Sequence, residues 1–305
     1  MLLVFGSLNA DMLFAVEALP RPGETVLCPG YELAAGGKGA NQAAAAAKAG
    51  ADVRMVGHLG DDSFGAFTRD VMVGAGVDCS TVGTSKRATA IAVIGVDRAA
   101  ENQIIVASGA NLDTHPDQIS STLLGPSVTV LCQNEILPEA TFELLKRAKA
   151  AGAQTMLNLA PAAALEREMA GHLDVLIVNE IEAAMAVGHE AIGDDALMFA
   201  TDLSRQLGVT VVITLGANGA VAAGPAGRFM ATSLKVEPVD TTGAGDAFVG
   251  VLAAALDQGE NLPLALQRAS VGAGLACTGL GAQTSQPLAI AIQDRLLDVT
   301  IEHIT

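Results

Sequence analysis

The sequence predicts an α/β fold with three layers, in which a central, mostly parallel sheet is flanked by helices and a small β-sheet forms a lid. Short apolar runs rich in Val, Ile and Leu alternate along the chain with longer, Ala-rich amphipathic segments. This alternation is the pattern of βαβ units, whose strands are parallel. Two stretches interrupt it with alternating apolar and polar residues, which indicates strands outside the βα units.

The predicted strands of the central sheet are six apolar runs, at residues 2–6, 53–57, 128–132, 155–158, 175–178 and 210–214. The predicted helices lie at residues 38–49, 63–75, 138–150, 180–186, 196–207, 247–256 and 262–277. Polar residues gather at the C-terminal ends of the strands. Because ligands of open α/β sheets bind beyond those ends, we expect the functional residues there.

The two interruptions predict the lid. Residues 12–33 contain Pro20, Pro22 and Gly23, and residues 89–106 read as two strands around a turn at 97–102. We expect the lid to comprise about residues 10–35 and 86–108 and to cover the ligand crevice. No linker or domain-length repeat divides the chain, so residues 1–305 are expected to form a single domain.

The charge balance argues against a nucleic-acid partner. The 305 residues include 17 Lys and Arg against 33 Asp and Glu, a formal net charge of −16, and the acidic residues are scattered. Such a surface repels a phosphate backbone. Eight Phe, one Tyr and no Trp also offer no stacking platform for single strands. An anionic substrate would need local groups or a metal to neutralise it.

Missing patterns disfavour several classes of protein. The four cysteines show no CxxC spacing and the five histidines no metal-binding spacing, so we expect no zinc site. GxGxxG and GxSxG do not occur, which weakens dehydrogenase and hydrolase interpretations. The first residues lack the pattern of a signal peptide, and no run approaches 18 apolar residues. We therefore expect a cytoplasmic protein that does not bind membranes.

The segment Asp240-Thr-Thr-Gly-Ala-Gly-Asp246 is the most informative, because two glycines precede an apolar helical pattern. Gly243 and Gly245 allow a ligand to approach the backbone closely, and the amides of a helix N-terminus bind anions. Asp246 could then accept a proton from a hydroxyl while those amides stabilise a transferring phosphoryl group. An N-capping role for the aspartate explains the spacing equally well.

A second glycine cluster, Gly36-Gly-Lys-Gly-Ala-Asn-Gln42, also leads into a predicted helix. It does not match a Walker A loop, since Glu32 replaces the first Gly and Gly39 replaces the final Ser or Thr. Lys38 and Asn41 among small residues favour a surface for a polar small molecule. The alternative is a helix start with a solvated lysine.

Two acidic segments follow predicted strands. Asn9-Ala-Asp11 places a carboxylate in the expected crevice, where it could bind adjacent sugar hydroxyls, although a turn aspartate is the simpler account. Asn179-Glu-Ile-Glu182 opens a helix, and a carboxylate there could hold hydrated magnesium near phosphates. Acidic residues that complement the helix dipole are the simpler account of that second segment.

The segment Thr214-Leu-Gly-Ala-Asn-Gly219 follows the last predicted strand of the central sheet. Its threonine and glycines could line a nucleotide. A hairpin turn also accounts for it.

Together, these five segments resemble the PfkB-type carbohydrate kinases, the ribokinase family, in their order and spacing. The resemblance runs from Leu2 to about Pro287, and three further segments read as family segments: Pro22-Gly-Glu-Thr25, Gly109-Ala-Asn111 and Gly281-Ala-Gln283. It implies a three-layer ribokinase-like fold with a β-lid. It also implies ATP-dependent phosphorylation of the primary hydroxyl of a sugar, with D-ribose converted to D-ribose 5-phosphate as the expected reaction.

The resemblance implies a role for individual residues. Asp246 would be the catalytic base, and Gly243, Ala244 and Gly245 would form the anion hole. The sugar would be bound by Asn9, Asp11, Gly37, Lys38, Asn41, Glu135 and Asp246. ATP and its phosphates would lie against Asn179, Glu182, Thr214, Gly216, Gly219, Gly245 and Ser270, with Glu182 serving Mg²⁺ indirectly.

Family members also bind a potassium-like cation beside the anion hole and often form dimers through the lid. The resemblance places the cation among Asp240, Thr242, Ala276, Gly279, Gly281 and Ser285. The implied cofactors are therefore ATP, Mg²⁺ and K⁺, and the implied assembly is a homodimer.

Two positions depart from the usual family pattern. Asn134 stands where many members have an apolar residue, and Leu159 stands where they commonly have proline. Both are expected near the crevice, so another pentose or hexose remains an alternative substrate.

Two other functions also stay open. A nucleoside kinase of the adenosine or inosine type would use the same fold, with Phe14, Tyr31 and Phe64 as the rings available near the base. A sugar-binding module without catalysis is the alternative outside the enzymes, because a fold does not guarantee an activity.

Overall fold

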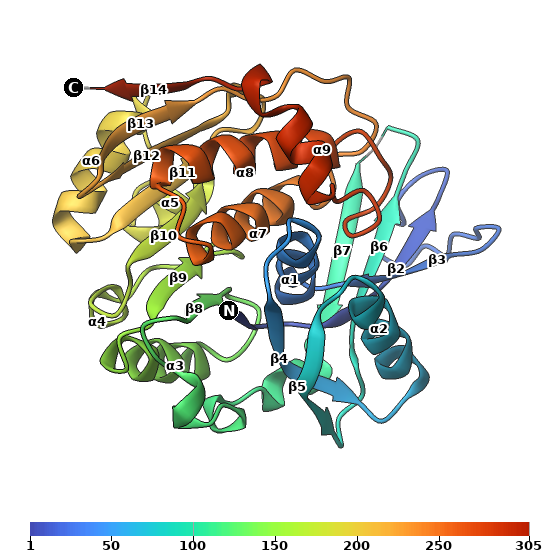
Figure 1. Ribbon diagram of the computed structural model, residues 1–305. Helices are drawn as coiled ribbons and strands as arrows, with labels where there is room; N and C mark the ends of the chain where they lie inside the picture. The colour runs from blue at the N-terminus through green and yellow to red at the C-terminus, as the bar shows by residue number, and fades with distance from the viewer. Residues whose placement is uncertain (100, 305) are drawn as a thin grey trace.

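The computed structural model of the chain describes residues 1–99 and 101–304 (Figure 1). Ala100, which belongs to the predicted lid segment 86–108, lies outside the described residues, as does Thr305. Within the described ranges, no helix combines the length and the apolar character that crossing a membrane requires.

Among the described residues, a ten-stranded sheet runs through the molecule in the order β14-β13-β12-β11-β10-β9-β8-β1-β4-β5. Its parallel part comprises β1 (Leu2–Phe5), β4 (Val53–Gly60), β5 (Asp78–Ser85), β8 (Thr129–Cys132), β9 (Gln154–Asn158), β10 (Val175–Asn179) and β11 (Thr210–Thr214). Antiparallel strands extend the β11 edge: β12 (Ala220–Gly224), β13 (Gly227–Ala231) and β14 (Ile301–Ile304).

Helices cover both faces of this sheet (Figure 1). One hydrophobic core includes residues of α1 (Lys38–Lys48), α2 (Ser63–Gly74), α7 (Ala244–Asp257), α8 (Leu262–Ala276) and α9 (Ala289–Asp294). The core on the opposite face includes residues of α3 (Pro138–Ala150), α4 (Arg167–Ala170), α5 (Glu180–Ala186) and α6 (Ala196–Leu207).

Strand β1 shows why the sheet must lie between two helical layers. Leu2 and Val4 belong to one core, whereas Leu3 and Phe5 belong to the other. Successive side chains of a strand point to opposite faces, and all four of these are fully buried. Burial on both faces is what the continuous apolar runs predicted, and the predicted three-layer α/β fold is confirmed.

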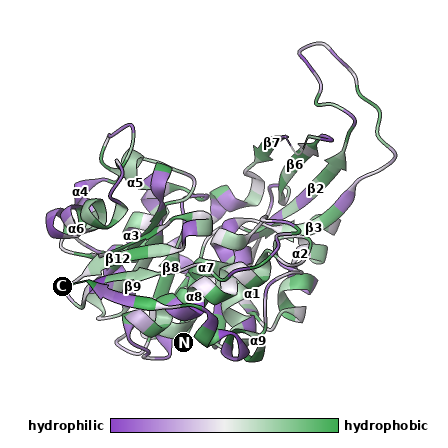
Figure 2. Cartoon of the chain, turned by 90° about the horizontal axis from the view of Figure 1, so that it is seen from above, coloured by the Kyte–Doolittle hydropathy of each residue, from purple (hydrophilic) through white to green (hydrophobic). Residues whose placement is uncertain are grey.

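A second sheet of four strands stands out to one side of the main body (Figures 1 and 2). Its order is β3 (Glu32–Gly36), β2 (Asn9–Ala15), β6 (Ala90–Val96) and β7 (Asn102–Ala107). β6 and β7 are antiparallel, as the reading of two strands around a turn predicted. The two interruptions of the βα pattern therefore build one small sheet, although they are separated along the chain by α1, β4, α2 and β5.

Some elements were not predicted, and their composition explains why. Strand β12 reads AVAAG, and Ala and Gly are uncommon in strands. Strands β13 (GRFMA) and β14 (IEHI) contain polar residues, so neither stands out as an apolar run. Strand β5 is mostly polar and small, and α4 and α9 are short.

The start predicted for α7 was wrong by three residues. The helix begins at Ala244 rather than at Ala247, because Gly243 adopts the left-handed conformation, with φ of 77°, and caps it. Asp246 is therefore the third residue of the helix and not its N-cap.

Candidate active site

Segments that are far apart in the sequence converge beyond the carboxyl ends of the parallel strands. Two cavities lie there, and Thr214 and Gly245 line both of them. The large cavity, of about 490 Å³, lies between the turn after β11, residues 233–238 and helices α7 and α8. The small cavity, of about 160 Å³, contains Lys38 and Asp246. The two cavities adjoin each other at Thr214 and Gly245, and the small one reaches Asp246.

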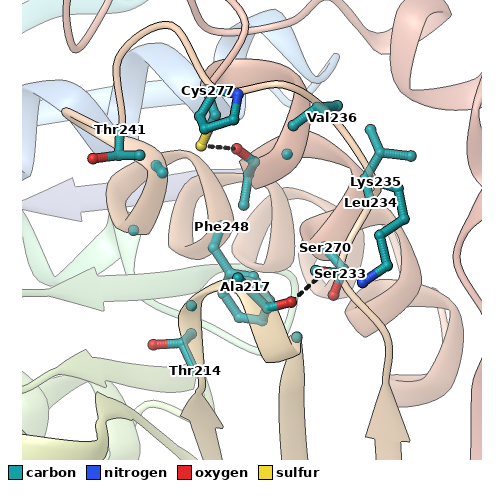
Figure 3. Close-up of a pocket in the computed structure, with 17 residues that line it drawn as sticks. Thr214, Ala217, Ser233, Leu234, Lys235, Val236, Thr241, Phe248, Ser270 and Cys277 are labelled. Carbon is teal, nitrogen blue, oxygen red and sulfur yellow. Dashed lines mark hydrogen bonds between the residues drawn. The ribbon is translucent and has the colours of Figure 1, made fainter.

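The large cavity has an apolar wall with a few polar groups (Figure 3). Leu234, Val236 and Phe248 line it, and so does Ser270 of α8. Ser270 is only 4% exposed, and its Oγ finds no hydrogen-bond partner among the described residues. A buried polar atom without a partner favours a ligand that supplies one.

The turn between β11 and β12 forms one end of the large cavity. Gly216 and Gly219 have φ of 56° and 95°, and the amide of Leu215 donates to the carbonyl of Gly219 at 2.8 Å. β11 and β12 are antiparallel, so the hairpin account of this segment is correct. The same hairpin places Thr214 and both glycines on the cavity wall, as the nucleotide interpretation requires.

Asp246 is buried, with 9% of its surface exposed, and both of its carboxylate oxygens accept hydrogen bonds. Asn41 Nδ2 donates to Oδ2 at 2.9 Å, and Gln42 Nε2 donates to Oδ1 at 2.9 Å. These donors belong to α1, so the two glycine-rich segments singled out in the sequence meet at one carboxylate. Each oxygen has two lone pairs, so an acceptor position remains for a substrate hydroxyl.

The backbone before Asp246 forms the start of α7. The amide of Ala244 donates to the carbonyl of Thr241 at 3.2 Å, whereas the amides of Gly245 and Asp246 find no acceptor among the described residues. Free amides at the first turn of a helix bind anions, and the helix dipole adds to the attraction. The free donors at this turn are therefore the amides of Gly245 and Asp246, whereas the amide of Ala244 is already paired.

Lys38 provides the positive charge of the small cavity. Burial alone would lower the pKa of its side chain, but the charges of Asp246, Glu135 and Glu182 raise that pKa above its ordinary value. Lys38 therefore stays protonated while it lies among three carboxylates. A cation in this position can neutralise a transferred phosphoryl group, which the acidic surface of the protein cannot do.

Glu135 contacts the glycine-rich segment through the backbone. Its Oε2 accepts from the amide of Lys38 at 2.9 Å and from the Oγ of Ser7 at 2.6 Å. Ser7 in turn accepts from the amide of Gly39 at 3.2 Å. The start of α1 is thus attached both to the loop after β1 and to the loop after β8.

Asp11, on the lid strand β2, lies near these acidic groups. Burial, followed by the charges of Glu135 and Asp246, raises the pKa of its carboxyl to about 7. Its Oδ1 is buried and has no hydrogen-bond partner in the described part of the chain. Gly36 on the neighbouring strand β3 leaves space for the side chain of Asp11, because a Cβ at Gly36 would lie 1.9 Å from Asp11 Oδ2. A buried acceptor without a partner favours a ligand that donates a hydrogen bond to it.

Two predicted sugar-binding residues have their side chains partly occupied by the protein. Asn9 accepts from Asn111 Nδ2 at 2.8 Å through its Oδ1, which braces the first residue of β2. Asn41 accepts from Gln283 Nε2 at 3.0 Å while it donates to Asp246. One hydrogen of Asn41 Nδ2 remains for a substrate. Gly37, with φ of 87°, caps α1 beside the main chain of Ser7 and Asn9.

Asn179 and Glu182 form a capping box at the start of α5. Asn179 Oδ1 accepts from the amide of Glu182, and Glu182 Oε2 accepts from the amide of Asn179, both at 2.8 Å. This capping box was not among the sequence predictions, and both of its residues also line the small cavity beside Lys38 and Asp246. Burial is the main cause that raises the pKa of Glu182, with Asp246 adding to it and the Asn179 amide and Lys38 opposing it.

The predicted cation-binding residues Asp240, Gly279, Gly281 and Ser285 lie around one loop. Asp240 accepts from the amides of Thr242 and Gly281, both at 2.9 Å, and Ser285 Oγ donates to the carbonyl of Gly281 at 2.6 Å. Burial would raise the pKa of Asp240, but these hydrogen bonds outweigh it and lower that pKa.

This loop offers one carboxylate, a hydroxyl and main-chain oxygens, with Ala276 at the end of α8 beside it. Such hard oxygen donors fit an alkali cation. Among the described residues, no three His, Cys, Asp or Glu side chains gather in a way that could hold a metal ion.

The two departures from the family pattern, Asn134 and Leu159, both bear on the loop after β9. Asn134 donates through its side chain to the carbonyl of Pro161 at 2.9 Å and through its amide to that of Ala160 at 2.9 Å. Leu159 is buried in the α3 to α6 core. Both positions thus hold the loop after β9 in place.

Sequence reasoning missed three residues of the site: Gln42, Gln133 and Asn158. Gln42 Nε2 also donates to Asn158 Oδ1 at 2.8 Å, and Gln42 Oε1 accepts from Gln133 Nε2 at 2.8 Å. Gln42 stands at the end of a segment that the sequence singled out, and the other two stand just after β8 and at the end of β9. The signal was their position at strand ends, which applies to Glu135 after β8 as well.

A buried aspartate at a helix N-terminus, free amides beside it and a cavity that leads to it define a phosphotransferase with an alcohol as acceptor. The model of the pfkB family carbohydrate kinases matches residues 1–289, and the chain belongs to that family, as the resemblance predicted.

Individual relatives agree with this assignment. A ribokinase of Haemophilus influenzae is 34% identical over 295 residues, which cover 94% of this chain and 95% of that protein. The structure of ribokinase from Thermotoga maritima has a TM-score of 0.88 at 31% identity and covers 97% of this chain and 99% of its own. The structure of Arabidopsis thaliana ribokinase complexed with ribose and ATP also has a TM-score of 0.88, at 30% identity, and covers 97% and 98%.

Proposed function

We propose that this chain is an ATP-dependent carbohydrate kinase that converts D-ribose to D-ribose 5-phosphate. The observation that carries the proposal is the position of Asp246, which is buried at the first turn of α7 and lines the small cavity that adjoins the large one. The ribokinases among its relatives support ribose as the sugar and ATP as the donor.

The proposed reaction needs one base and one site for developing charge. Asp246 takes the proton of the sugar's primary hydroxyl, whose oxygen forms a bond to the γ-phosphorus of ATP as the bond to the β-phosphate oxygen breaks. ADP leaves from the large cavity. The amides of Gly245 and Asp246, with Lys38, stabilise the charge on the transferring group. Asp11, Glu135, Gly37 and the second hydrogen of Asn41 hold the sugar hydroxyls.

The donor phosphates are proposed to lie near Asn179, Glu182, Thr214 and Gly245, all of which line the small cavity. Glu182 and Asn179 suit a hydrated Mg²⁺, which would neutralise phosphate charge, because oxygen ligands acting through water are typical of that ion. Ser270, Gly216 and Gly219 are proposed to contact the nucleotide in the large cavity.

A K⁺ ion is proposed to bind the loop of Asp240, Thr242, Ala276, Gly279, Gly281 and Ser285. The loop is in contact with the anion site, because a Cβ on Gly243 would lie 2.7 Å from the Cα of Ala282. A cation there would fix the backbone that supports the first turn of α7.

We propose that residues 1–305 act as a single domain with the small sheet as a lid, which closes over the sugar and excludes water that could otherwise accept the phosphoryl group.

The edge strand β7 also favours a homodimer. Its side chains are exposed throughout, with Ile104, Ile105 and Val106 at 53%, 72% and 51%. An exposed apolar edge strand is a ready surface for pairing with a second copy. Light scattering on the purified protein tests the dimer.

The decisive experiment is coupled ADP release with Mg²⁺ and K⁺ present, for ribose, deoxyribose, arabinose, fructose, adenosine and inosine at equal concentration. Fast turnover with ribose alone supports the proposal. A preferred nucleoside or a different sugar would reassign the substrate, and binding of ribose without ATP consumption would leave a binding module.

The lid rings argue against a nucleobase beside Asp11. Phe14 packs against Tyr31 with ring centroids 5.6 Å apart. Positions 11 and 14 of one strand have opposite parity, so Phe14 lies on the face of β2 opposite to Asp11.

An ATP-dependent sugar kinase with four free cysteines is proposed to work in the reducing cytoplasm.

A further inference from the structure

Gln42 is a completely buried side chain whose amide makes three hydrogen bonds. Its Nε2 donates to Asp246 Oδ1 at 2.9 Å and to Asn158 Oδ1 at 2.8 Å, and its Oε1 accepts from Gln133 Nε2 at 2.8 Å. Both amide hydrogens are thereby used. No amide hydrogen of Gln42 is left to donate to a substrate, so its side chain donates only to other side chains of the protein.

The partners of Gln42 fix its orientation from the central sheet. Gln133 directly follows β8, and Asn158 ends β9 and donates through Nδ2 to the carbonyl of Ile177 in β10 at 3.1 Å. The loop after β1 leaves room for Gln133, because a Cβ on Gly6 would lie 2.0 Å from Gln133 Oε1. The amide of Gln42 is therefore tied to neighbouring parallel strands.

This arrangement has an electrostatic consequence for Asp246. A hydrogen bond to a carboxylate favours the ionised form, and an amide donor cannot itself give up its proton. Gln42 thus donates to Oδ1 without competing for the proton that the base must accept. It also holds the plane of the carboxylate, while Asn41 holds Oδ2 from the same helix.

We infer that Gln42 is a positioning residue for Asp246, held by Gln133 and Asn158, which keeps the carboxylate of the base aimed at the acceptor hydroxyl. The inference rests on the proposed function for its catalytic meaning. The effect on the ionisation of Asp246 can be measured without catalysis, so the two can fail separately.

The test compares two variants of Gln42 with one control. Gln42→Met keeps the length of the side chain and removes the amide, and Gln42→Glu keeps its shape but places a carboxylate against Asp246. The matched control is Gln118→Met, which removes another amide that is hydrogen bonded at both ends, to Gly57 and Thr81 and from His115. Gln118 contacts neither Asp246 nor its partners.

Three measurements are made on the full chain. The first is kcat and KM for ribose and for ATP, the second is the acidic limb of the kcat/KM profile against pH, and the third is the carboxyl titration of Asp246 by ¹³C NMR with labelled aspartate. Asp246→Asn identifies the signal.

For Gln42→Met we expect kcat to fall by about 10-fold to 100-fold, with KM for ATP within about twofold of the wild type. The acidic limb of the kcat/KM profile and the NMR midpoint should both move to higher pH, because a hydrogen bond to the carboxylate is lost. Gln42→Glu should move them further, because two adjacent carboxylates share one proton. Gln118→Met should lower the melting temperature and leave the kinetics and both midpoints unchanged.

Unchanged midpoints in Gln42→Met, with activity lost only in proportion to unfolded protein, would reduce Gln42 to a structural amide. If the wild type phosphorylates no substrate of the panel, the proposed function fails. The NMR midpoints of the Gln42 variants then still decide whether Gln42 controls the ionisation of Asp246.

Discussion

The side chains of Asn41 and Asp246, 205 positions apart in the sequence, are joined by a hydrogen bond of 2.9 Å from Nδ2 to Oδ2. Asn41 comes from the glycine-rich start of α1 and Asp246 from the glycine-rich start of α7. The segment that is proposed to hold the sugar is thereby attached to the group that is proposed to activate it. Any displacement of α1 would also displace the acceptor for the proton.

Replacing Asp246 by Asn should abolish transfer and preserve binding. The amide cannot accept the hydroxyl proton, so we expect kcat to fall by about 10² to 10⁴-fold. Ribose affinity, measured by titration calorimetry, should stay within about threefold, because Asp11, Glu135 and the backbone contacts remain. Near-normal turnover in this variant would remove Asp246 from the mechanism.

Ribose binding should weaken as the pH falls through 7. The pKa of Asp11 is raised to about 7, so its carboxyl is increasingly protonated below that pH and loses an acceptor for the sugar hydroxyls. If only the ionised form binds, the dissociation constant rises by about tenfold between pH 8 and pH 6. Calorimetric titrations across this range measure it, and in Asp11→Asn affinity should be lower and independent of pH.

The same group makes a prediction for stability. A carboxyl whose folded-state pKa lies above its ordinary value binds more protons in the folded state, so its contribution to stability declines as the pH rises from about 4 to 7. Asp11→Asn removes a buried charge and should therefore melt at a higher temperature than the wild type at pH 8. Equal melting temperatures at pH 8 would mean that the charge is fully solvated.

Much of the fold followed from the sequence because buried parallel strands read as apolar runs. The strand predicted at 210–214 and the helices predicted at 138–150, 180–186 and 196–207 have the bounds that the structure shows. Strand β12 could not be recognised because Ala and Gly carry little strand signal, and β13 and β14 could not because polar residues interrupt them.

The site was predictable wherever one short segment carries both a turn and a polar group. Asp11, Lys38 and Asp246 were found in that way. Gln133 and Asn158 were not, because they reach Asp246 only through Gln42, and the sequence separations of 91 and 116 residues are closed by tertiary packing alone.

Potassium should activate the enzyme through the loop around Asp240. Asp240 holds the amides of Thr242 and Gly281, and the neighbouring Ala282 touches Gly243. We expect kcat of the wild type to rise several-fold with KCl at constant ionic strength, with choline chloride as the balancing salt. In Asp240→Ala the rate should be low and independent of KCl. Activation that persists in this variant would place the cation elsewhere.

Ser270 should contribute to nucleotide binding and not to the fold. Its Oγ is buried and unpaired in the described chain, so Ser270→Ala removes a desolvated hydroxyl at little cost to stability. If a nucleotide pairs with this hydroxyl, KM for ATP should rise about threefold to tenfold while KM for ribose is unchanged. An unchanged KM for ATP would mean that the nucleotide does not reach α8.

Two glycines at the start of α7 should respond in opposite ways to the same substitution. Gly243 has φ of 77°, and a Cβ there would lie 2.7 Å from the Cα of Ala282. Gly245 lies inside the helix, and a Cβ there meets no described atom within 4 Å. That open space is the junction of the two cavities, where the phosphate is proposed to bind.

Gly243→Ala should therefore lose about 1 to 3 kcal/mol of stability through backbone strain. Gly245→Ala should be as stable as the wild type or gain about 0.5 to 1 kcal/mol, because Ala favours a helix over Gly. Its kcat/KM for ATP should nevertheless fall at least tenfold, since the methyl group occupies the site of the transferring phosphoryl group. Thermal melts and steady-state kinetics on both variants measure this contrast, and full activity in Gly245→Ala would show that the phosphate does not approach this turn of α7.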